Sequence, residues 1–381
     1  MAEAQAFAAT DGGFRAAYAA GGAWGDTTQA CLEALGELQA GANLGFVYAT
    51  DALSGDLQRV VEKLRHSTGI ANWVGTVGTG ISACGVEIHD RPALAVLVGA
   101  FAEDGFRIFE PIADGLEDFT AAHGAWIEKR APYFGIVHAD PRAANLPGLL
   151  AGLSAQTASF LVGGLTASRG EMAQIAGRVS HGGLSGALFS PDLQVVTGLT
   201  QGCSPIAPPR VVTEADENVV MTIDNRPAVE VFNEDIGELL AHDPSRIAGY
   251  IFAAFPISQS DTGDYLVRNL TGIDPENGWL AVGHLVSPGD RIMFCRRDHD
   301  AAVADMKRML VDVKRRAERP PRAGVYYSCV ARGPHLFGSD SEELKMIRDE
   351  LGDLPLVGFF ANGEISHDRL YGYTGVLALF L

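Results

Sequence analysis

Three glycine-containing clusters combine the residue types that a small-molecule pocket needs. They are the segments GLTQGCSPIAPP, YYSCVARGPHLFG and GFFANGEISH. Glycine permits positive φ angles and a close approach of the backbone to a ligand, and a few convergent polar groups fix the ligand's orientation. The candidate ligand-binding residues in these clusters are Gln201, Cys203, Cys329, Arg332, Gly333, Asn362, Gly363 and Glu364. The same pattern also fits tight turns that contain small buried thiols.

A fourth cluster, VGTVGTGISACG, contains Gly78 and Gly80. Its string GTVGTG is superficially similar to a dinucleotide-binding fingerprint, but the residues that follow predict a strand. Because a pyrophosphate binds at the start of a helix, the loop does not predict a nucleotide site. We therefore assign Gly78 and Gly80 to the same ligand pocket as the other clusters.

Cys329 also raises the question of catalysis. Together with His335 or His367 it would form a nucleophile and base, but the sequence identifies no third residue to orient the base. A Cys-dependent hydrolase or transferase therefore remains an alternative, and no catalytic residue is assigned. His299, which stands between two aspartates, fits the start of a helix better than a metal site.

Composition excludes several classes of partner. The chain has 381 residues, of which 29 are basic and 47 acidic, giving a net charge of −18. Such a charge argues against nucleic acid and anionic membranes as partners. The five cysteines form no CxxC motif, which favours reduced thiols in a cytoplasmic protein. The sequence also contains no signal peptide and no apolar run long enough to span a bilayer.

One order of elements recurs along the chain. Residues 44–101, 134–190 and 324–381 each predict a strand, a helix, a second strand, a glycine-containing loop and a last strand. In the last copy, Ser339 and Glu342 predict the capping box that starts the helix. We predict a mixed α/β fold of two duplicated halves, with mixed sheets covered by helices in a pseudo-two-fold sandwich. The proline-rich segment near 205–215 places the boundary between halves 1–210 and 211–381.

Several of these motifs resemble a known family. The segment GLTQGCSPIAPPRVVTEADENVVMTIDNRPAVEVF is similar to the junction region of the FIST family, named for F-box and intracellular signal transduction proteins. YYSCVARG followed by LPLVGFFANGEI resembles the C-terminal half of that family, and WVGTVGTGISACGVEI resembles the N-terminal half more loosely. The resemblance implies a FIST N-type half over 1–210 and a FIST C-type half over 211–381, in a bacterial stand-alone protein.

The resemblance also implies a function. It suggests a sensory protein, not an enzyme, that binds an amino acid or related metabolite and acts in signal transduction. The chain has no output domain, so the signal would pass to a separate partner, such as a histidine kinase or a cyclic-nucleotide signalling protein. Some bacterial members bind haem and respond to nitric oxide, so a haem-binding nitric-oxide sensor is an alternative. No catalytic residue set accompanies the family.

A specific pocket follows from the repeats. If the repeated sheets face one another, their glycine loops converge at one end, and Glu364 lies at a pocket mouth. A carboxylate there suits an ammonium group, and Arg332 could bind a ligand carboxylate through its planar guanidinium. We expect Cys329, Glu364 and Cys203 to line this cavity together with the Gly78–Gly80 loop.

Overall fold

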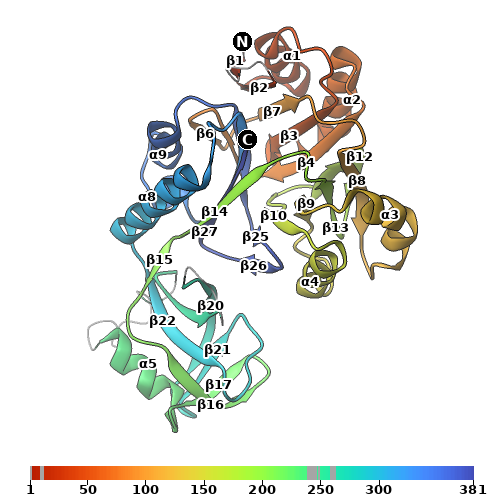
Figure 1. Ribbon diagram of the computed structural model, residues 1–381. Helices are drawn as coiled ribbons and strands as arrows, with labels where there is room; N and C mark the ends of the chain where they lie inside the picture. The colour runs from red at the N-terminus through yellow and green to blue at the C-terminus, as the bar shows by residue number, and fades with distance from the viewer. Residues whose placement is uncertain (1, 9–12, 238–246, 248, 258–262) are drawn as a thin grey trace. The chain divides into compact units, whose positions relative to one another are not determined.

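The computed structural model describes residues 2–8, 13–237, 247, 249–257 and 263–381 (Figure 1). The chain forms two compact units. Unit 1 contains Met1–Thr200, Met306–Leu370 and Thr374–Leu381, and unit 2 contains Gln201–Asp305 and Tyr371–Tyr373. Both units combine helices with sheets, which confirms the predicted mixed α/β class. The predicted halves 1–210 and 211–381 are a different division of the chain and stay a prediction.

Unit 1 repeats one order of elements three times. The first repeat contains β2 (Phe14–Ala20), α1 (Trp24–Leu35), β3 (Leu44–Thr50), the short helix η1 (Asp51–Asp56), α2 (Leu57–Thr68), β4 (Asn72–Gly78), β5 (Gly80–Ala83), β6 (Val86–His89) and β7 (Ala93–Gly99). The second contains β8 (Phe106–Ile112), α3 (Glu117–Arg130), β9 (Phe134–Ala139), α4 (Leu146–Thr157), β10 (Phe160–Leu165), β11 (Ala173–Ala176), β12 (Arg178–His181) and β13 (Leu184–Phe189). The third contains β14 (Val195–Gln201), α8 (His299–Arg316), β23 (Ala323–Cys329), η2 (Gly333–His335), α9 (Glu342–Leu351), β24 (Leu356–Ala361), β25 (Glu364–Ser366), β26 (Arg369–Tyr371) and β27 (Thr374–Phe380).

The strand pairing is the same in every repeat. The strand between the two helices pairs parallel to the next strand and antiparallel to the last, as β3 does with β4 and β7, β9 with β10 and β13, and β23 with β24 and β27. The predicted relation between residues 44–101 and 324–381 is therefore confirmed in strand order and direction. All three segments in which the sequence predicted this order, 44–101, 134–190 and 324–381, lie in unit 1. The sequence of unit 2 interrupts the third copy between β14 and α8.

One hairpin of each repeat pairs with a strand of another repeat. The β5–β6 hairpin of the first repeat pairs with β24, the β25–β26 hairpin of the third pairs with β10, and the β11–β12 hairpin of the second pairs with β4. The exchange is cyclic, so each of the three large sheets contains strands from two repeats. This pairing makes unit 1 a three-part structure, in place of the expected pseudo-two-fold sandwich.

One glycine in each repeat explains how closely the parallel strands pack. Gly75, Gly163 and Gly358 occupy equivalent positions in the second strand of the parallel pair. A Cβ atom at each would lie 1.7 Å from the carbonyl oxygen of Val47, Val137 and Tyr326, respectively. No other residue type fits at that distance, so the three repeats share one steric requirement.

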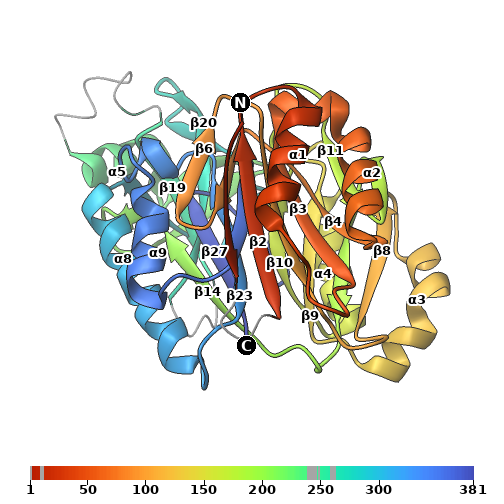
Figure 2. The same ribbon diagram turned by 90° about the horizontal axis from the view of Figure 1, so that it is seen from above.

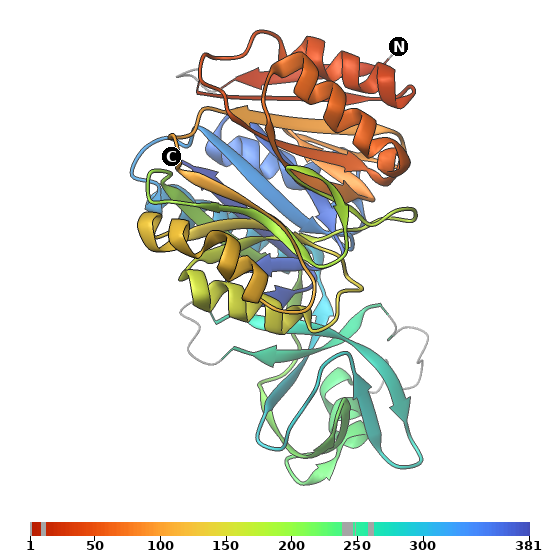
Figure 3. The same ribbon diagram turned by 90° about the vertical axis from the view of Figure 1, so that its right-hand side faces the viewer.

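The three sheets enclose a common core and carry their helices outside. The core cluster contains side chains of all three sheets, among them Phe46, Phe134 and Phe359. Helices α1 and α2 pack on the outer face of the first sheet (Figure 2), and α3 and α4 pack on that of the second (Figure 3). Helix α9 begins at Glu342 with Ser341 before it, so the capping box predicted at Ser339 is wrong.

Unit 2 is built on antiparallel strands. Its elements are β15 (Cys203–Pro205), β16 (Arg210–Asp216), β17 (Val219–Ile223), β18 (Arg226–Pro227), α5 (Ala228–Ile236), β19 (Ile251–Pro256), β20 (Tyr265–Asp274), β21 (Trp279–Val282) and β22 (Arg291–Arg297). Phe232 of α5 packs edge-on against Phe294 of β22, with ring centroids 4.8 Å apart. Over the residues the structure describes, no helix has the length and apolar character to cross a membrane.

Candidate ligand-binding site

The core of unit 1 changes from apolar to polar toward the carboxyl ends of its parallel strand pairs. Bound ligands in α/β proteins commonly lie beyond these ends of the strands. We call the polar side chains there the polar layer. Its members are Tyr48, Thr76, His138, Gln174, Ser185, Tyr327, Cys329, Glu364 and Thr374. Cys329 is 7% exposed and the other eight residues are fully buried, so the layer is enclosed by protein.

The centre of the polar layer is a contact between equivalent residues of the three repeats. Tyr48, His138 and Tyr327 are each the fifth residue of their strand. The hydroxyl oxygens of Tyr48 and Tyr327 lie 2.6 Å apart, and Nε2 of His138 lies 3.3 Å from the Tyr48 hydroxyl. Burial lowers the pKa of His138 to about 3, so its imidazole is neutral. Its Nδ1 has no hydrogen-bond partner among the described residues.

Glu364 is the acidic member of the layer. It enters from β25, opposite Gly164 of β10. Its Oε2 accepts hydrogen bonds from the backbone N–H of Thr374 at 3.1 Å and from the Thr374 hydroxyl at 2.7 Å. Burial raises its pKa to about 8, although the bonds from Thr374, the positive charge of Arg332 and a hydrogen bond from the Cys329 thiol lower it. The carboxyl group is therefore mostly protonated at neutral pH.

Neighbouring polar groups have their hydrogen bonds within the protein. The Ser185 hydroxyl donates to Oε1 of Gln174 at 2.5 Å, and Nε2 of Gln174 donates to the carbonyl oxygen of Gly182 at 3.2 Å. The Thr76 hydroxyl lies 2.8 Å from that of Thr166. In contrast, Oε1 of Glu364 receives no N–H or O–H hydrogen bond from the residues that the structure describes. This oxygen and Nδ1 of His138 are the free hydrogen-bonding atoms of the layer.

The glycine loops predicted from the sequence follow the second strands of two parallel pairs, β4 and β24. Asn362 and Gly363 directly precede Glu364, and the backbone N–H of Asn362 donates to the carbonyl oxygen of Leu165 at 3.1 Å. Gly78 and Gly80 form the equivalent turn of the first repeat. A Cβ on Gly80 would lie 2.3 Å from Nδ1 of His89. Unit 1 thus contains Glu364, Cys329 and the loops that the sequence associated with them.

Arg332 and Gly333 follow β23 on the helix-covered side of the third sheet. Arg332 is 0% exposed, and its Nε donates to Oε1 of Glu343 at 2.8 Å. The Tyr326 hydroxyl and the backbone N–H of Gly333 donate to the same carboxylate. The guanidinium also lies 4.8 Å from the Phe337 ring centroid. Its Nη1 has no hydrogen-bond partner among the described residues. The guanidinium therefore forms a buried ion pair with Glu343, and the ligand contact expected of Arg332 stays a prediction.

Gln201 and Cys203 belong to unit 2. The Tyr265 hydroxyl donates to the carbonyl oxygen of Cys203 at 2.5 Å, and Nε2 of Gln201 donates to the carbonyl oxygen of Tyr265 at 3.2 Å. The thiol of Cys203 also hydrogen-bonds with that of Cys295. The expected approach of Cys203 to Cys329 and Glu364 stays a prediction, because these residues lie in different units.

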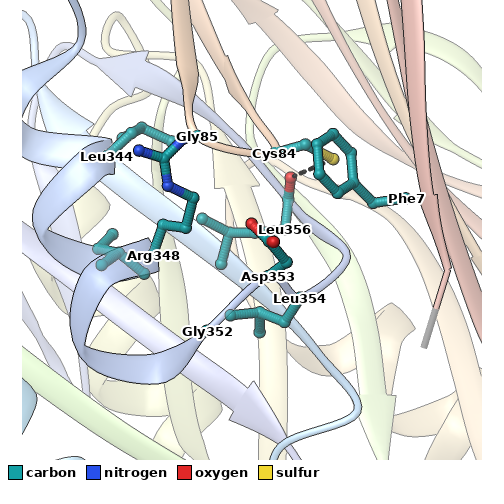
Figure 4. Close-up of a pocket in the computed structure, with 10 residues that line it drawn as sticks. Phe7, Cys84, Gly85, Leu344, Arg348, Gly352, Asp353, Leu354 and Leu356 are labelled. Carbon is teal, nitrogen blue, oxygen red and sulfur yellow. Dashed lines mark hydrogen bonds between the residues drawn. The ribbon is translucent and has the colours of Figure 1, made fainter. Parts of the chain in front are cut away.

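A small pocket elsewhere in unit 1 contains Cys84 (Figure 4). Its cavity volume is about 10 Å³, and it lies between Phe7 of β1 (Glu3–Ala8), the β5–β6 turn and the end of α9. The Cys84 thiol donates to the carbonyl oxygen of Leu356 at 3.6 Å. Burial raises the pKa of this thiol to about 12. The thiol is therefore not activated, and the pocket offers less chemistry than the polar layer.

The sequence pattern contains a signal for the contact of Tyr48, His138 and Tyr327, although it was not among the predicted site residues. The strands LGFVYAT, FGIVHAD and AGVYYSC carry Tyr48, His138 and Tyr327 at matching positions. An aromatic residue with a polar atom at the same place in three buried strands indicates a common interior contact. Aligning the repeats position by position would have found it.

Substituting Tyr48 with Phe tests this contact. The change removes the hydroxyl between Tyr327 and His138 and leaves two buried polar groups without that partner. We expect the free energy of unfolding to fall by about 1–3 kcal/mol, measured by urea denaturation. Tyr250→Phe is the control, because Tyr250 is 40% exposed. Equal, small effects of both changes would contradict the assigned role of the contact.

Comparison with known proteins identifies the family. The FIST N domain model matches residues 43–226, and the FIST C domain model matches residues 228–367. An uncharacterised protein of Mycobacterium tuberculosis strain H37Rv is 29% identical over 323 residues, which cover 81% of this chain and 83% of the relative. An uncharacterised protein of Mycobacterium bovis is 32% identical over 203 residues, 50% of this chain and 52% of the relative. The chain therefore belongs to the FIST family, with a FIST N domain followed by a FIST C domain.

Proposed function

We propose that this protein is a sensor that binds an amino acid or related amine metabolite in the polar layer of unit 1. FIST domains are associated with sensing in signal transduction and are not a known enzyme family. The observation that carries the proposal is Oε1 of Glu364, a buried carboxyl oxygen without an N–H or O–H donor. Such an atom is costly to bury unless a ligand supplies the missing hydrogen bond.

An ammonium group fits this position better than a neutral donor does. It brings a positive charge to a carboxyl group whose pKa burial has raised to about 8. The charge would favour the ionised carboxylate, and a charge-assisted hydrogen bond would form to it. The free Nδ1 of the neutral His138 provides a second polar contact in the layer.

Binding at this position also couples to a conformational change. Glu364 is 0% exposed, and in this proposal the loops at Gly78–Gly80 and Asn362–Gly363 enclose it. A ligand can therefore enter only if these loops open, so it binds the opened and closed arrangements differently. A ligand shifts a conformational equilibrium only through such a difference in affinity. We propose that a separate partner, such as a histidine kinase or a cyclic-nucleotide signalling protein, responds to this change in the cytoplasm.

Isothermal titration calorimetry with a panel of free amino acids and simple amines tests the proposal. Below pH 8, the affinity of the wild-type protein should rise about tenfold for each unit by which the pH increases, because binding requires Glu364 to lose a proton. Glu364→Gln keeps the shape but removes the charge, so the affinity should fall about tenfold to a hundredfold at pH 8 and lose this pH dependence.

The matched control is Glu128→Gln, which removes an exposed carboxyl group of α3. It should leave the affinity unchanged. If the panel contains a binder whose affinity is the same in wild type and Glu364→Gln, the ligand does not bind at the polar layer. If no amine of the panel binds the wild-type protein at any pH tested, the amine class itself is wrong.

A further inference from the structure

The first sheet of unit 1 has a strand that the second sheet lacks. Strand β1 (Glu3–Ala8) pairs antiparallel with the edge of β2, from Glu3 opposite Ala20 to Ala8 opposite Arg15. It also contacts α1. Strand β8 is the equivalent of β2, because each pairs antiparallel with the last strand of its own repeat. In the part of the chain that the structure describes, however, β8 is an edge strand of its sheet.

A hollow lies where the equivalent of β1 would be. It has a volume of about 780 Å³ and opens to solvent, and its lining comes from β8, the linker after it and the first half of α3. Ile108, Ile112 and Phe119 supply apolar surface. The hollow therefore has the same neighbours in the second repeat, an edge strand and the following helix, that β1 has in the first.

The acidic side chains that line the hollow favour a basic partner. Asp114, Glu117 and Asp118 line it and are exposed, and no basic side chain of the described chain forms an ion pair with them. Glu117 and Asp118 also stabilise the start of α3, but that role does not account for Asp114 or for the apolar surface beside it. A second copy of this chain, with its net charge of −18, would bring like charges together. A basic partner segment is complementary.

The edge itself limits how the segment can pair. Pro111 has no backbone N–H, and the pairing of β8 with β13 is irregular between Phe109 and Ile112. Proline and irregular pairing are features that protect an edge strand from unspecific association. The regular backbone from Phe106 to Phe109 remains as the length over which an added strand can form hydrogen bonds.

We propose that the edge of β8 binds an extended, basic segment of a partner protein as an added strand, between β8 and α3. The backbone of residues 106–109 would supply the hydrogen bonds, as in other cases of strand addition. Apolar side chains of the segment would contact Ile108 and Phe119, and its Lys or Arg residues would lie near Asp114, Glu117 and Asp118. This surface is separate from the polar layer and does not depend on the proposed ligand.

The probe is a fluorescein-labelled peptide of alternating lysine and valine, titrated with the full-length protein at low salt and followed by fluorescence anisotropy. We expect saturable binding that weakens as salt screens the charges. Neutralising the three acids together, by Asp114→Asn, Glu117→Gln and Asp118→Asn, should weaken binding at least tenfold. A control with the same change in net charge, Asp216→Asn with Glu217→Gln and Glu276→Gln in unit 2, should leave it intact.

Two further peptides separate strand addition from charge attraction alone. One carries N-methyl groups on alternate backbone nitrogens, which keeps every side chain but blocks the hydrogen bonds, and it should not bind. The other replaces lysine by glutamate and should not bind either. Equal binding of the N-methylated peptide, equal loss in both triple variants, or no saturation up to about 1 mM protein would overturn the proposal.

Discussion

Replacing Glu364 with Gln should make the protein more stable than wild type above pH 8. The carboxyl group has a pKa of about 8 in the folded protein, well above its ordinary value of 4.5. Between these values the unfolded chain releases the proton while the folded protein retains it. Wild-type stability should therefore fall by about 1.4 kcal/mol for each pH unit over this window.

The variant should not show this decline, because glutamine is neutral in both states. Its amide oxygen can still accept the two hydrogen bonds from Thr374. The difference in unfolding free energy between variant and wild type should move in favour of the variant by about 5 kcal/mol from pH 4.5 to pH 8. Below pH 4.5 and above pH 8, this difference in unfolding free energy should not change with pH.

Urea unfolding at a series of pH values measures this difference, and groups that titrate alike in both proteins cancel. Glu128→Gln, which removes an exposed carboxyl group, should run parallel to the wild type. If Glu364→Gln also runs parallel to it, Glu364 is ionised in the folded protein, and the protonated carboxyl group inferred from its burial is wrong.

The sequence revealed the repeated elements because their signals are local. Buried strands such as LGFVYAT and FGIVHAD, with an apolar helix face after each, can be recognised without tertiary information. The number of repeats in unit 1 was less clear. The third copy has about 100 residues of unit 2 inserted before α8, between Gln201 and Asp305. That insertion hid the strand and helix with which the copy begins.

The exchange of hairpins could not be predicted in the same way. The pairing of β25 with β10 joins residues about 200 positions apart, Val162 with Ser366, and nothing local encodes such a contact. This pairing is what carries Glu364 into the core of unit 1. From the sequence, the glycines before Glu364 indicated a pocket mouth, whereas the exchanged hairpin buries the carboxyl group completely.

The polar layer shows a second limit of sequence analysis. Tyr48 and His138 stand in strands that are otherwise apolar, so their pattern indicates burial and says nothing about which polar groups they meet. Their partner Tyr327 lies 279 residues from Tyr48. Arg332 shows the same dependence on tertiary structure. An arginine beside a glycine loop suggested a ligand contact, and the sequence did not indicate its partner Glu343, which lies one helix later and is equally buried.

Substituting Arg332 with Met should destabilise the protein strongly. Arg332 and Glu343 are both 0% exposed, with Nη2 and Oε1 2.7 Å apart. Methionine fills much of the space but leaves the Glu343 carboxylate buried without its cation. Breaking a buried pair in this way costs about 3–5 kcal/mol, so the urea midpoint should fall markedly.

The double variant Arg332→Met with Glu343→Gln distinguishes an ion pair from a ligand contact. Glutamine removes the unpaired charge. Its amide oxygen can still accept hydrogen bonds from the Ser328 hydroxyl and the Gly333 N–H, and its NH2 group can donate to the Tyr326 hydroxyl, which is the donor in the wild type. If the pair is structural, the double variant should recover most of the stability that the single variant loses, and its affinity for an amine ligand should match that of the wild type. If Arg332 instead serves the ligand, Arg332→Met should barely change the unfolding free energy, and both variants should lose affinity for ligands that carry a carboxylate while retaining it for simple amines.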